Sequence, residues 1–134
     1  MEIRYATEAD KLSIIRSLQN KHMDFNTPTH AKKDIENHSL IICIDNNKIV
    51  GSLALCQPTH GYWAIKRGCV YNKKNQGKGI MSALFQYALS LNKGYYGCTP
   101  WAENTKIISI ITKYGFTYQK TVCEKYLVYT KGEK

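Results

Sequence analysis

A basic loop with two glycines runs directly into an apolar helix pattern in the middle of the chain. The stretch from Asn72 to Gly94 reads NKKNQGKGIMSALFQYALSLNKG. The first backbone N–H groups of a helix have no acceptor within the helix, and together with the helix dipole they suit a phosphate or pyrophosphate. Glycines allow such a ligand to approach closely, and the loop adds the charges of Lys73, Lys74 and Lys78. The loop has neither Walker A nor GxGxxG spacing, so a plain solvated loop is the alternative interpretation.

The other reactive side chains form no metal or nucleophile motif. His22, His30 and His38 lack the spacing of metal ligands and the cysteines form no pairs, so no metal is expected. No GxSxG nucleophile elbow occurs. All the cysteines lie in strand-like runs or, for Cys98, directly after one. Their scatter and odd number favour buried, reduced thiols in a cytoplasmic protein: Cys43, Cys56, Cys69, Cys98 and Cys123.

Hydrophobic periodicity predicts the elements that must position the loop. Strands are expected over 2–7, 39–45, 48–57, 62–71 and 95–98, with one or two closing strands over 116–130. Helices are expected over 7–22, over 31–38, from Ile80 to Leu91, and before Gly115, with a loop over 23–30. Thr7 and Asp10 have the spacing of a capping box. The order β-α-α-β-β-β-α-β-α-β-β predicts an α+β fold in three layers, with a mixed central sheet of about six to seven strands and about four helices.

Length and composition fit one domain over residues 1–134. No stretch approaches the roughly 18 apolar residues of a membrane span, and the opening MEIRYATEAD has no apolar run, so neither a membrane segment nor a signal peptide is expected. The net charge is +9, from 19 Lys and Arg against 10 Asp and Glu. Such an excess implies an anionic partner, and nucleic acid, an acidic surface and a phosphorylated cofactor all remain open.

Three segments in order resemble the GNAT acyltransferase superfamily. The stretch CVYNKKNQGKGIMSALFQYAL is similar to the family's strand, Gln/Arg-x-x-Gly-x-Gly/Ala loop and helix, with Gln76 and Gly79 in place and Met81 where a small residue is usual. NTKIISIITKYGF resembles the downstream pattern NxxAxxxYxxxGF through Asn104, Gly115 and Phe116. IRYATEADKLSIIRSL resembles the family's first strand and helix. The resemblance covers nearly the whole chain and agrees with its β-α order.

The resemblance implies acetyl-CoA as the acyl donor and an amine of a small molecule or peptide as the acceptor. The pyrophosphate would take the N–H groups from Gln76 to Met81, with a hydroxyl from Ser82, and Asn104 would contact the pantetheine arm. The same arm would pair with the backbone of Cys69, Val70 and Tyr71. The expected cofactor-binding residues of the loop and helix are Gln76, Gly77, Lys78, Gly79, Ile80, Met81 and Ser82.

The resemblance leaves the proton-transfer groups open. The family's tyrosine, which often protonates the leaving thiolate, corresponds to Ile111, so Tyr114 is the substitute candidate, although a tyrosine at the edge of the core is the alternative. The family's usual strand carboxylate is also missing, because the strand over 62–71 offers only Lys66 and Arg67. His60 and Glu103 are the candidate bases, the first by its unperturbed pKa and the second with a helix-dipole role as its alternative.

These departures keep a second class of function in view, a weakly catalytic or non-catalytic CoA binder or a nucleic-acid-directed relative. Aromatic residues that can stack on bases are Tyr62, Trp63, Tyr95, Tyr96 and Trp101. Their strand positions also fit sheet faces and the core. The grouping of lysines outside the loop on one face would discriminate between the two classes. The acceptor and the oligomeric state, with a homodimer as one possibility, have no signature in the sequence.

Overall fold

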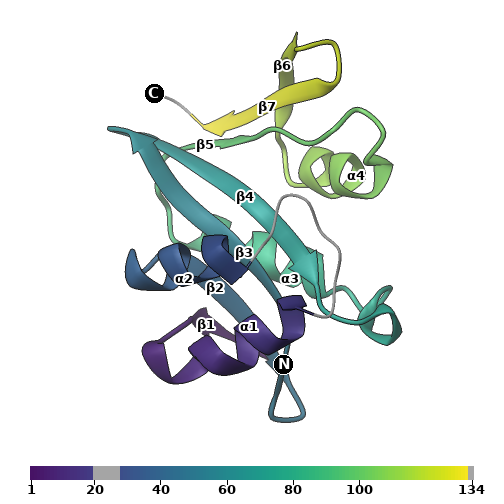
Figure 1. Cartoon of the computed structure of the whole chain (residues 1–134). Coiled ribbons are helices and arrows are strands. Elements are labelled where there is room, and N and C mark those ends of the chain that lie inside the picture. Colours follow the sequence, from purple (N-terminus) through teal and green to yellow (C-terminus); the bar gives the residue numbers. More distant parts are fainter. Residues whose placement is uncertain (20–27, 133–134) are drawn as a thin grey trace.

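The computed structural model describes residues 1–19 and 28–132. Within these residues the helices are α1 (Lys11–Gln19), α2 (Pro28–Glu36), α3 (Ile80–Ser90) and α4 (Thr105–Lys113), with two short 3-10 turns, η1 (Glu8–Asp10) and η2 (Lys73–Asn75). The strands are β1 (Glu2–Tyr5), β2 (Leu40–Asp45), β3 (Lys48–Thr59), β4 (Tyr62–Val70), β5 (Tyr95–Cys98), β6 (Thr117–Val122) and β7 (Tyr126–Gly132). Figure 1 shows their arrangement.

The strands form one mixed sheet in the order β1-β2-β3-β4-β5-β7-β6. The first four strands are an antiparallel meander, and β7 is antiparallel to both β5 and β6. β4 and β5 are parallel. A parallel pair requires a crossover connection, and α3 supplies it. The α+β class, the mixed sheet and the predicted order of elements are confirmed.

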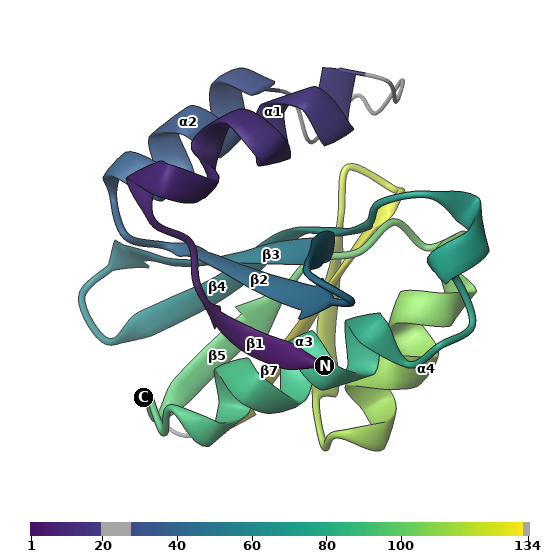
Figure 2. The same cartoon turned by 90° about the horizontal axis from the view of Figure 1, so that it is seen from below.

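Helices cover both faces of the sheet, as Figure 2 shows, with α1 and α2 on one face and α3 and α4 on the other. Successive side chains of a strand point to opposite faces of the sheet, so each face has its own hydrophobic core. Ile41 and Cys43 pack with the α3 residue Phe85, whereas Ile42 packs with Ile14 of α1 and Ile35 of α2. The loop between β4 and α3 therefore leaves a sheet that is covered by helices on both faces.

The predicted capping box at the start of the first helical segment is present. The Thr7 backbone N–H donates to Asp10 Oδ2 at 2.8 Å. Arg4 of β1 donates to both oxygens of the same carboxylate, at 2.8 Å and 3.1 Å. The hydrogen bonds from Arg4 and Thr7 lower the pKa of Asp10 to about 2.

Three sequence-based boundaries need correction. α2 begins at Pro28, inside the predicted 23–30 loop, because proline fits the first turn of a helix as well as it breaks one. The rest of that loop and the expected end of the first helix lie outside the described residues. β3 extends to Thr59. Cys123 lies exposed in the β6–β7 turn rather than in a strand, whereas Cys43, Cys69 and Cys98 are buried.

Within residues 1–19 and 28–132, none of the helices has the length and apolar character needed to cross a membrane.

Candidate functional site

A fork between β4 and β5 opens the sheet at its centre. The parallel pairing joins Trp63–Ile65 to Tyr96–Cys98. β5 then ends, while β4 continues to Val70. A cleft of about 750 Å³ lies at this fork, lined by parts of β4 and β5, the 99–104 connection and α4. Parallel strands that separate at their carboxyl ends are a common place for ligands to bind.

A β-bulge in β4 lies at the vertex of the fork. Ser52 of β3 pairs with Cys69 and Ala54 pairs with Lys66, so β4 carries one extra residue between them. Within that extra stretch Arg67 has φ 53°, in the left-handed region. A bulge bends its strand and increases the local twist. Lys66, Arg67 and Gly68 all line the cleft, so the bulge forms part of its wall.

The glycines of the β4–α3 loop are required by backbone conformation. Gly77 has φ 82° and Gly79, the N-cap of α3, has φ 76°. A Cβ added at either glycine would meet nothing within 4 Å, so space is not limiting there. Both residues are exposed, as are Gln76 and Lys78. The loop therefore presents the N–H end of α3 to solvent beside the cleft, as an anion site requires.

A third glycine, which sequence reasoning missed, sets the position of α3. A Cβ at Gly51 of β3 would lie 2.8 Å from Ile80 Cγ2 and 3.0 Å from the Cys69 carbonyl oxygen. Only glycine therefore allows the first turn of α3 to approach the sheet this closely. An isolated glycine within a strand pattern was the available signal.

Met81 is accommodated by a partner glycine. A Cβ at Gly68 of β4 would lie 3.0 Å from Met81 Sδ, so the thioether packs directly over the Gly68 backbone. Met81 is half-buried and is not among the described residues that line the cleft. Ser82 next to it is half-buried in the first turn of α3.

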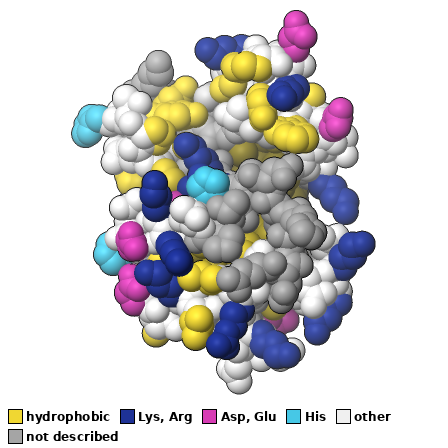
Figure 3. All heavy atoms as spheres, viewed as in Figure 1, with side chains coloured by type: hydrophobic (Ala, Val, Ile, Leu, Met, Phe, Trp, Pro, Cys, Tyr) yellow, Lys and Arg dark blue, Asp and Glu magenta, His cyan; other side chains and the backbone are white. Residues whose placement is uncertain are grey.

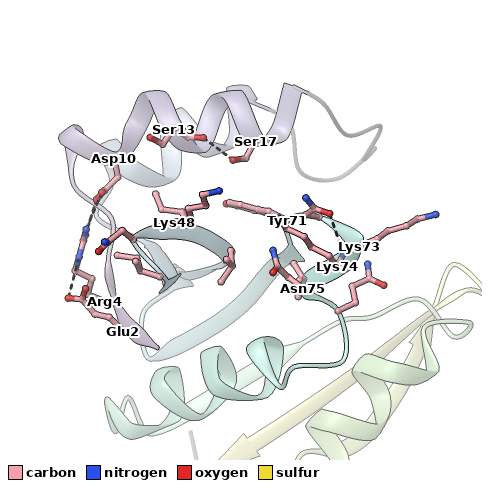
Figure 4. A pocket seen from close by; sticks show the side chains of 17 residues that line it. Glu2, Arg4, Asp10, Ser13, Ser17, Lys48, Tyr71, Lys73, Lys74 and Asn75 are labelled. Atoms are coloured by element: carbon pink, nitrogen blue, oxygen red, sulfur yellow. Dashed lines mark hydrogen bonds and ion pairs between the residues drawn. The ribbon is translucent and has the colours of Figure 1, made fainter.

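The end of β4 separates the cleft from a second, larger cavity. This cavity, of about 1130 Å³, lies between α1 and the sheet and is lined by Val70, Tyr71 and Gln76, among others (Figure 4). The Tyr71 hydroxyl donates to Ser52 Oγ at 2.5 Å and is buried, which raises its pKa. Cys69 is buried on the α1–α2 face. The smaller cleft, by contrast, lies at the bulge and at the parallel pair of strands.

The candidate catalytic residues are dispersed. Glu103 is exposed and lines the cleft, while His60 is exposed in the β3–β4 turn and, among the described residues, is not part of the lining. Asn104 also lines the cleft, and its side-chain oxygen caps α4 by accepting from the Ile107 N–H at 3.3 Å. Tyr114 ends α4, half-buried at the edge of the core, and its carbonyl accepts from Lys131 Nζ at 2.6 Å.

Two tyrosine hydroxyl groups at the cleft were not singled out for proton transfer by the sequence. Tyr62 and Tyr126 both line it. Tyr62 lies across Gly97 of β5, where an added Cβ would overlap the phenol hydroxyl. Burial raises the pKa of Tyr62, so the phenol holds its proton at neutral pH. The sequence signal for this contact was the alternation in YWAIK and YYGC, which indicates two strands whose side chains on one face can meet.

The thiol of Cys98 also lines the cleft but is unsuited to nucleophilic catalysis. Burial raises the pKa of Cys98 to about 12. A nucleophilic cysteine needs its thiolate form. The cleft therefore favours a reaction without an acyl-cysteine intermediate.

Positive charge is distributed rather than gathered on the face seen in Figure 3. Lys and Arg side chains occur at several separate places on that face, with acidic side chains between some of them. The stacking candidates are also divided: Trp63 and Tyr96 pack against the core on the α3–α4 side, whereas Tyr62 and Trp101 line the cleft. Neither observation favours a nucleic-acid surface on the face shown.

A sequence model of the acetyltransferase (GNAT) family matches residues 10–116 of this chain. The match covers most of the chain, and the protein therefore belongs to the GNAT acetyltransferase family. The predicted family and enzyme class are confirmed. Comparison with curated proteins gives no match.

Solved structures with the same fold include several acetyltransferases of low sequence identity. A GNAT acetyltransferase from Bacillus cereus ATCC 10987 is 17% identical with a TM-score of 0.85, covering 99% of this chain and 97% of its own. The ribosomal-protein-S18-alanine N-acetyltransferase from Escherichia coli is 12% identical with a TM-score of 0.80, covering 98% and 92%. The diaminobutyrate acetyltransferase EctA from Paenibacillus lautus, solved with its substrate and coenzyme A, is 13% identical with a TM-score of 0.77, covering 98% and 93%. At these identities the likeness establishes the fold.

Proposed function

We propose that the protein transfers the acetyl group of acetyl-CoA directly to an amine. The observation that carries this proposal is the fork between β4 and β5, with the N-terminus of α3 beside it, in a chain of the GNAT family. Acetyl-CoA, when bound, supplies the acetyl group as an activated thioester.

The β4–α3 loop holds the diphosphate in this proposal. The N–H groups from Gly77 to Ser82 have no acceptor within the helix, since the earliest helical bond runs from the Ala83 N–H to the Gly79 carbonyl at 3.0 Å. The Gln76 N–H, predicted to bind the diphosphate, instead donates to the Lys73 carbonyl at 3.1 Å, so it is left out of this set. Positive φ at Gly77 and Gly79 fits a loop that turns its amides outward. Lys78 is exposed in the same loop and supplies charge. The backbone of Cys69, Val70 and Tyr71 at the end of β4, together with Asn104, would hold the pantetheine arm.

Proton transfer falls to groups that line the cleft. Glu103 is the better supported of the two predicted bases, because it lines the cleft and His60 does not. Its carboxylate takes a proton from the acceptor ammonium, directly or through water. Tyr62 and Tyr126 replace Tyr114 as candidate acids for the leaving thiolate, since both bring hydroxyl groups to the cleft. Cys98 is not assigned a nucleophilic role, because burial raises the pKa of its thiol to about 12.

The acceptor amine is either that of a peptide or that of a small molecule. The Escherichia coli relative acts on a ribosomal-protein alanine and the Paenibacillus lautus relative on 2,4-diaminobutyric acid, so both classes occur on this fold. The alternative, a non-catalytic CoA binder, is motivated by the lack of an acid in β4, which offers only Lys66 and Arg67, and by Ile111, which is fully buried at the place of the family's tyrosine.

The test has two parts. Calorimetry with CoA measures cofactor binding, and an acetyl-CoA turnover assay over alanyl peptides, 2,4-diaminobutyric acid and simple polyamines measures transfer. We expect binding in the micromolar range and turnover with at least one amine, lowered by Glu103→Gln. Absence of CoA binding at millimolar concentration would refute the proposal, and binding without turnover on any acceptor would favour the non-catalytic alternative.

A further inference from the structure

We infer that Asp34 is a positioning residue: through Arg67 it holds the bulge of β4 in the conformation that opens the fork. This inference rests on the proposed function, because it takes the fork as the CoA site. The pair joins α2 to β4 across the α1–α2 face of the sheet. Its members are 33 residues apart in the chain.

The ion pair has two bonds and little solvent. Arg67 Nε donates to Asp34 Oδ2 at 3.1 Å, and Arg67 Nη2 donates to Asp34 Oδ1 at 2.7 Å. The side chain of Asp34 is 6% exposed and that of Arg67 is 19% exposed. A two-pronged contact between guanidinium and carboxylate fixes direction as well as distance. Because a lone buried carboxylate is costly, Asp34 strongly favours any backbone conformation of β4 that keeps Arg67 in reach.

Asp34 is itself anchored. Its backbone carbonyl accepts from the Ser39 N–H at 2.8 Å and from Ser39 Oγ at 3.1 Å, where α2 turns toward β2. Ala31 and Ile35 of the same helix are buried against the sheet. The carboxylate is therefore presented to β4 from a helix end that is held in place by its own contacts.

Arg67 needs such an anchor because its own backbone is unfavourable. Its φ of 53° is left-handed, a region that L-residues other than glycine, asparagine and aspartate seldom occupy. Without the extra residue of the bulge, the side chains of β4 that follow Arg67 would point to the opposite faces of the sheet. The ion pair offsets the backbone cost and selects the bulged form.

The bulge lies where it can control the cofactor cleft. The last described pair between β4 and β5 is Ile65 with Cys98, and the bulge comes directly after it. Lys66 and Gly68 of the bulge line the cleft. On the opposite face Met81 packs onto Gly68. Asp34 therefore holds one side of the bulge and α3 the other, and loss of the Asp34 contact lets β4 relax at the vertex of the fork.

Two double variants separate this role from ordinary stabilisation. Asp34→Asn with Arg67→Gly and Asp34→Asn with Arg67→Ala both remove the ion pair, but only glycine adopts a φ near 53° without cost. We expect the glycine variant to bind CoA within about threefold of the parent, and the alanine variant to bind at least about tenfold more weakly, because the left-handed form is penalised. Because a φ near 53° also favours glycine over alanine in overall stability, thermal unfolding of both variants is measured alongside, and CoA affinity is compared at a temperature where both are fully folded.

The matched control removes a similar ion pair away from the cleft. Asp10→Asn with Arg4→Ala breaks the two bonds of Arg4 to Asp10, and neither residue lines the cleft, so CoA affinity should stay within about twofold. If the Asp34 variants do not fold, Arg67→Asn and Arg67→Gln with Asp34 intact repeat the comparison, since asparagine tolerates the left-handed region and glutamine does not.

Deuterium uptake of residues 66–71 without CoA gives a readout independent of the cofactor. We expect faster uptake, corrected for intrinsic rates, in the alanine variant than in the glycine variant. Equal CoA affinity of the alanine and glycine variants would overturn the inference. If the parent does not bind CoA, equal deuterium uptake in these two variants would overturn it. Failure of the parent to bind CoA counts against the proposed function alone, because faster uptake in the alanine variant than in the parent, which retains the ion pair, still decides the role of Asp34.

Discussion

Replacing Gly79 by aspartate or by asparagine tests whether the N-terminus of α3 holds a diphosphate. Gly79 is the N-cap of α3 with φ 76°, and an added Cβ would meet nothing within 4 Å. Asparagine and aspartate are the side chains that best tolerate this φ, and they have the same shape. The two variants therefore differ in one negative charge at the same place.

The expected loss of affinity follows from Coulomb's law. Two unit charges about 6 Å apart interact by about 3 kcal/mol at an effective dielectric constant of about 20. The loop is exposed, so solvent screening reduces this repulsion to about 1–2 kcal/mol. That free energy corresponds to about a five- to thirtyfold higher Kd for CoA in Gly79→Asp than in Gly79→Asn.

Stability should move the other way, which separates repulsion from misfolding. Aspartate at a helix N-cap interacts favourably with the helix dipole, so Gly79→Asp should be at least as stable as Gly79→Asn without cofactor. Calorimetric titration with CoA and thermal unfolding measure the two quantities. The affinity gap should close near 1 M salt, where the Debye length is about 3 Å. Equal Kd values at low salt would show that the diphosphate does not lie at the start of α3.

Three further predictions address the core, the cleft and pH. Ile111 is fully buried, so Ile111→Tyr should lower the free energy of unfolding by at least about 2 kcal/mol through overpacking and a buried hydroxyl. Its turnover should not exceed that of the control Ile111→Phe, and a gain of about tenfold specific to Tyr would show that the ring reaches the cleft. Gly97→Ala would overlap the Tyr62 ring and should destabilise the protein by about 1–3 kcal/mol, a cost that should largely vanish in a Tyr62→Ala background, as a double-mutant cycle by denaturant unfolding can measure. The pKa of Asp10 is lowered to about 2 in the folded protein, so its contribution to stability is present above the pKa of an unfolded aspartate, about 4, and is lost as pH falls toward 2. The Tm of Asp10→Asn should therefore drop less between pH 5 and pH 2 than the Tm of the parent. Equal drops in Tm would contradict this assignment.

Local patterns in the sequence were sufficient for the order of elements and for the loop. Apolar spacing from Ile80 onward defines α3, and glycine at positions 77 and 79 indicates a left-handed backbone before it. The capping box at Thr7 was also local, since its two members are three residues apart. These features depend on residues close in the chain, where periodicity and capping preferences act directly.

The predicted element boundaries were wrong where one residue type is compatible with two kinds of local structure. Pro28 was interpreted as part of a loop but begins α2, because its fixed φ suits the first helical turn. Cys123 was assigned to a strand but lies in a turn with φ 53°, which the preceding β-rich residues did not indicate.

The sequence by itself determined the family motifs, the helix N-terminus beside a basic loop, and the order of helices and strands along the chain. Only the tertiary structure decided which side chains meet at the fork. Tyr62 reaches across Gly97 on a strand far away in the sequence, and Asp34 meets Arg67 across the sheet. Tyr114 and Ile111 share one helix, yet Ile111 is enclosed in the core and Tyr114 lies at its edge. Such contacts depend on strand register and layer packing, which join residues distant in the chain and leave no periodic signal in the sequence.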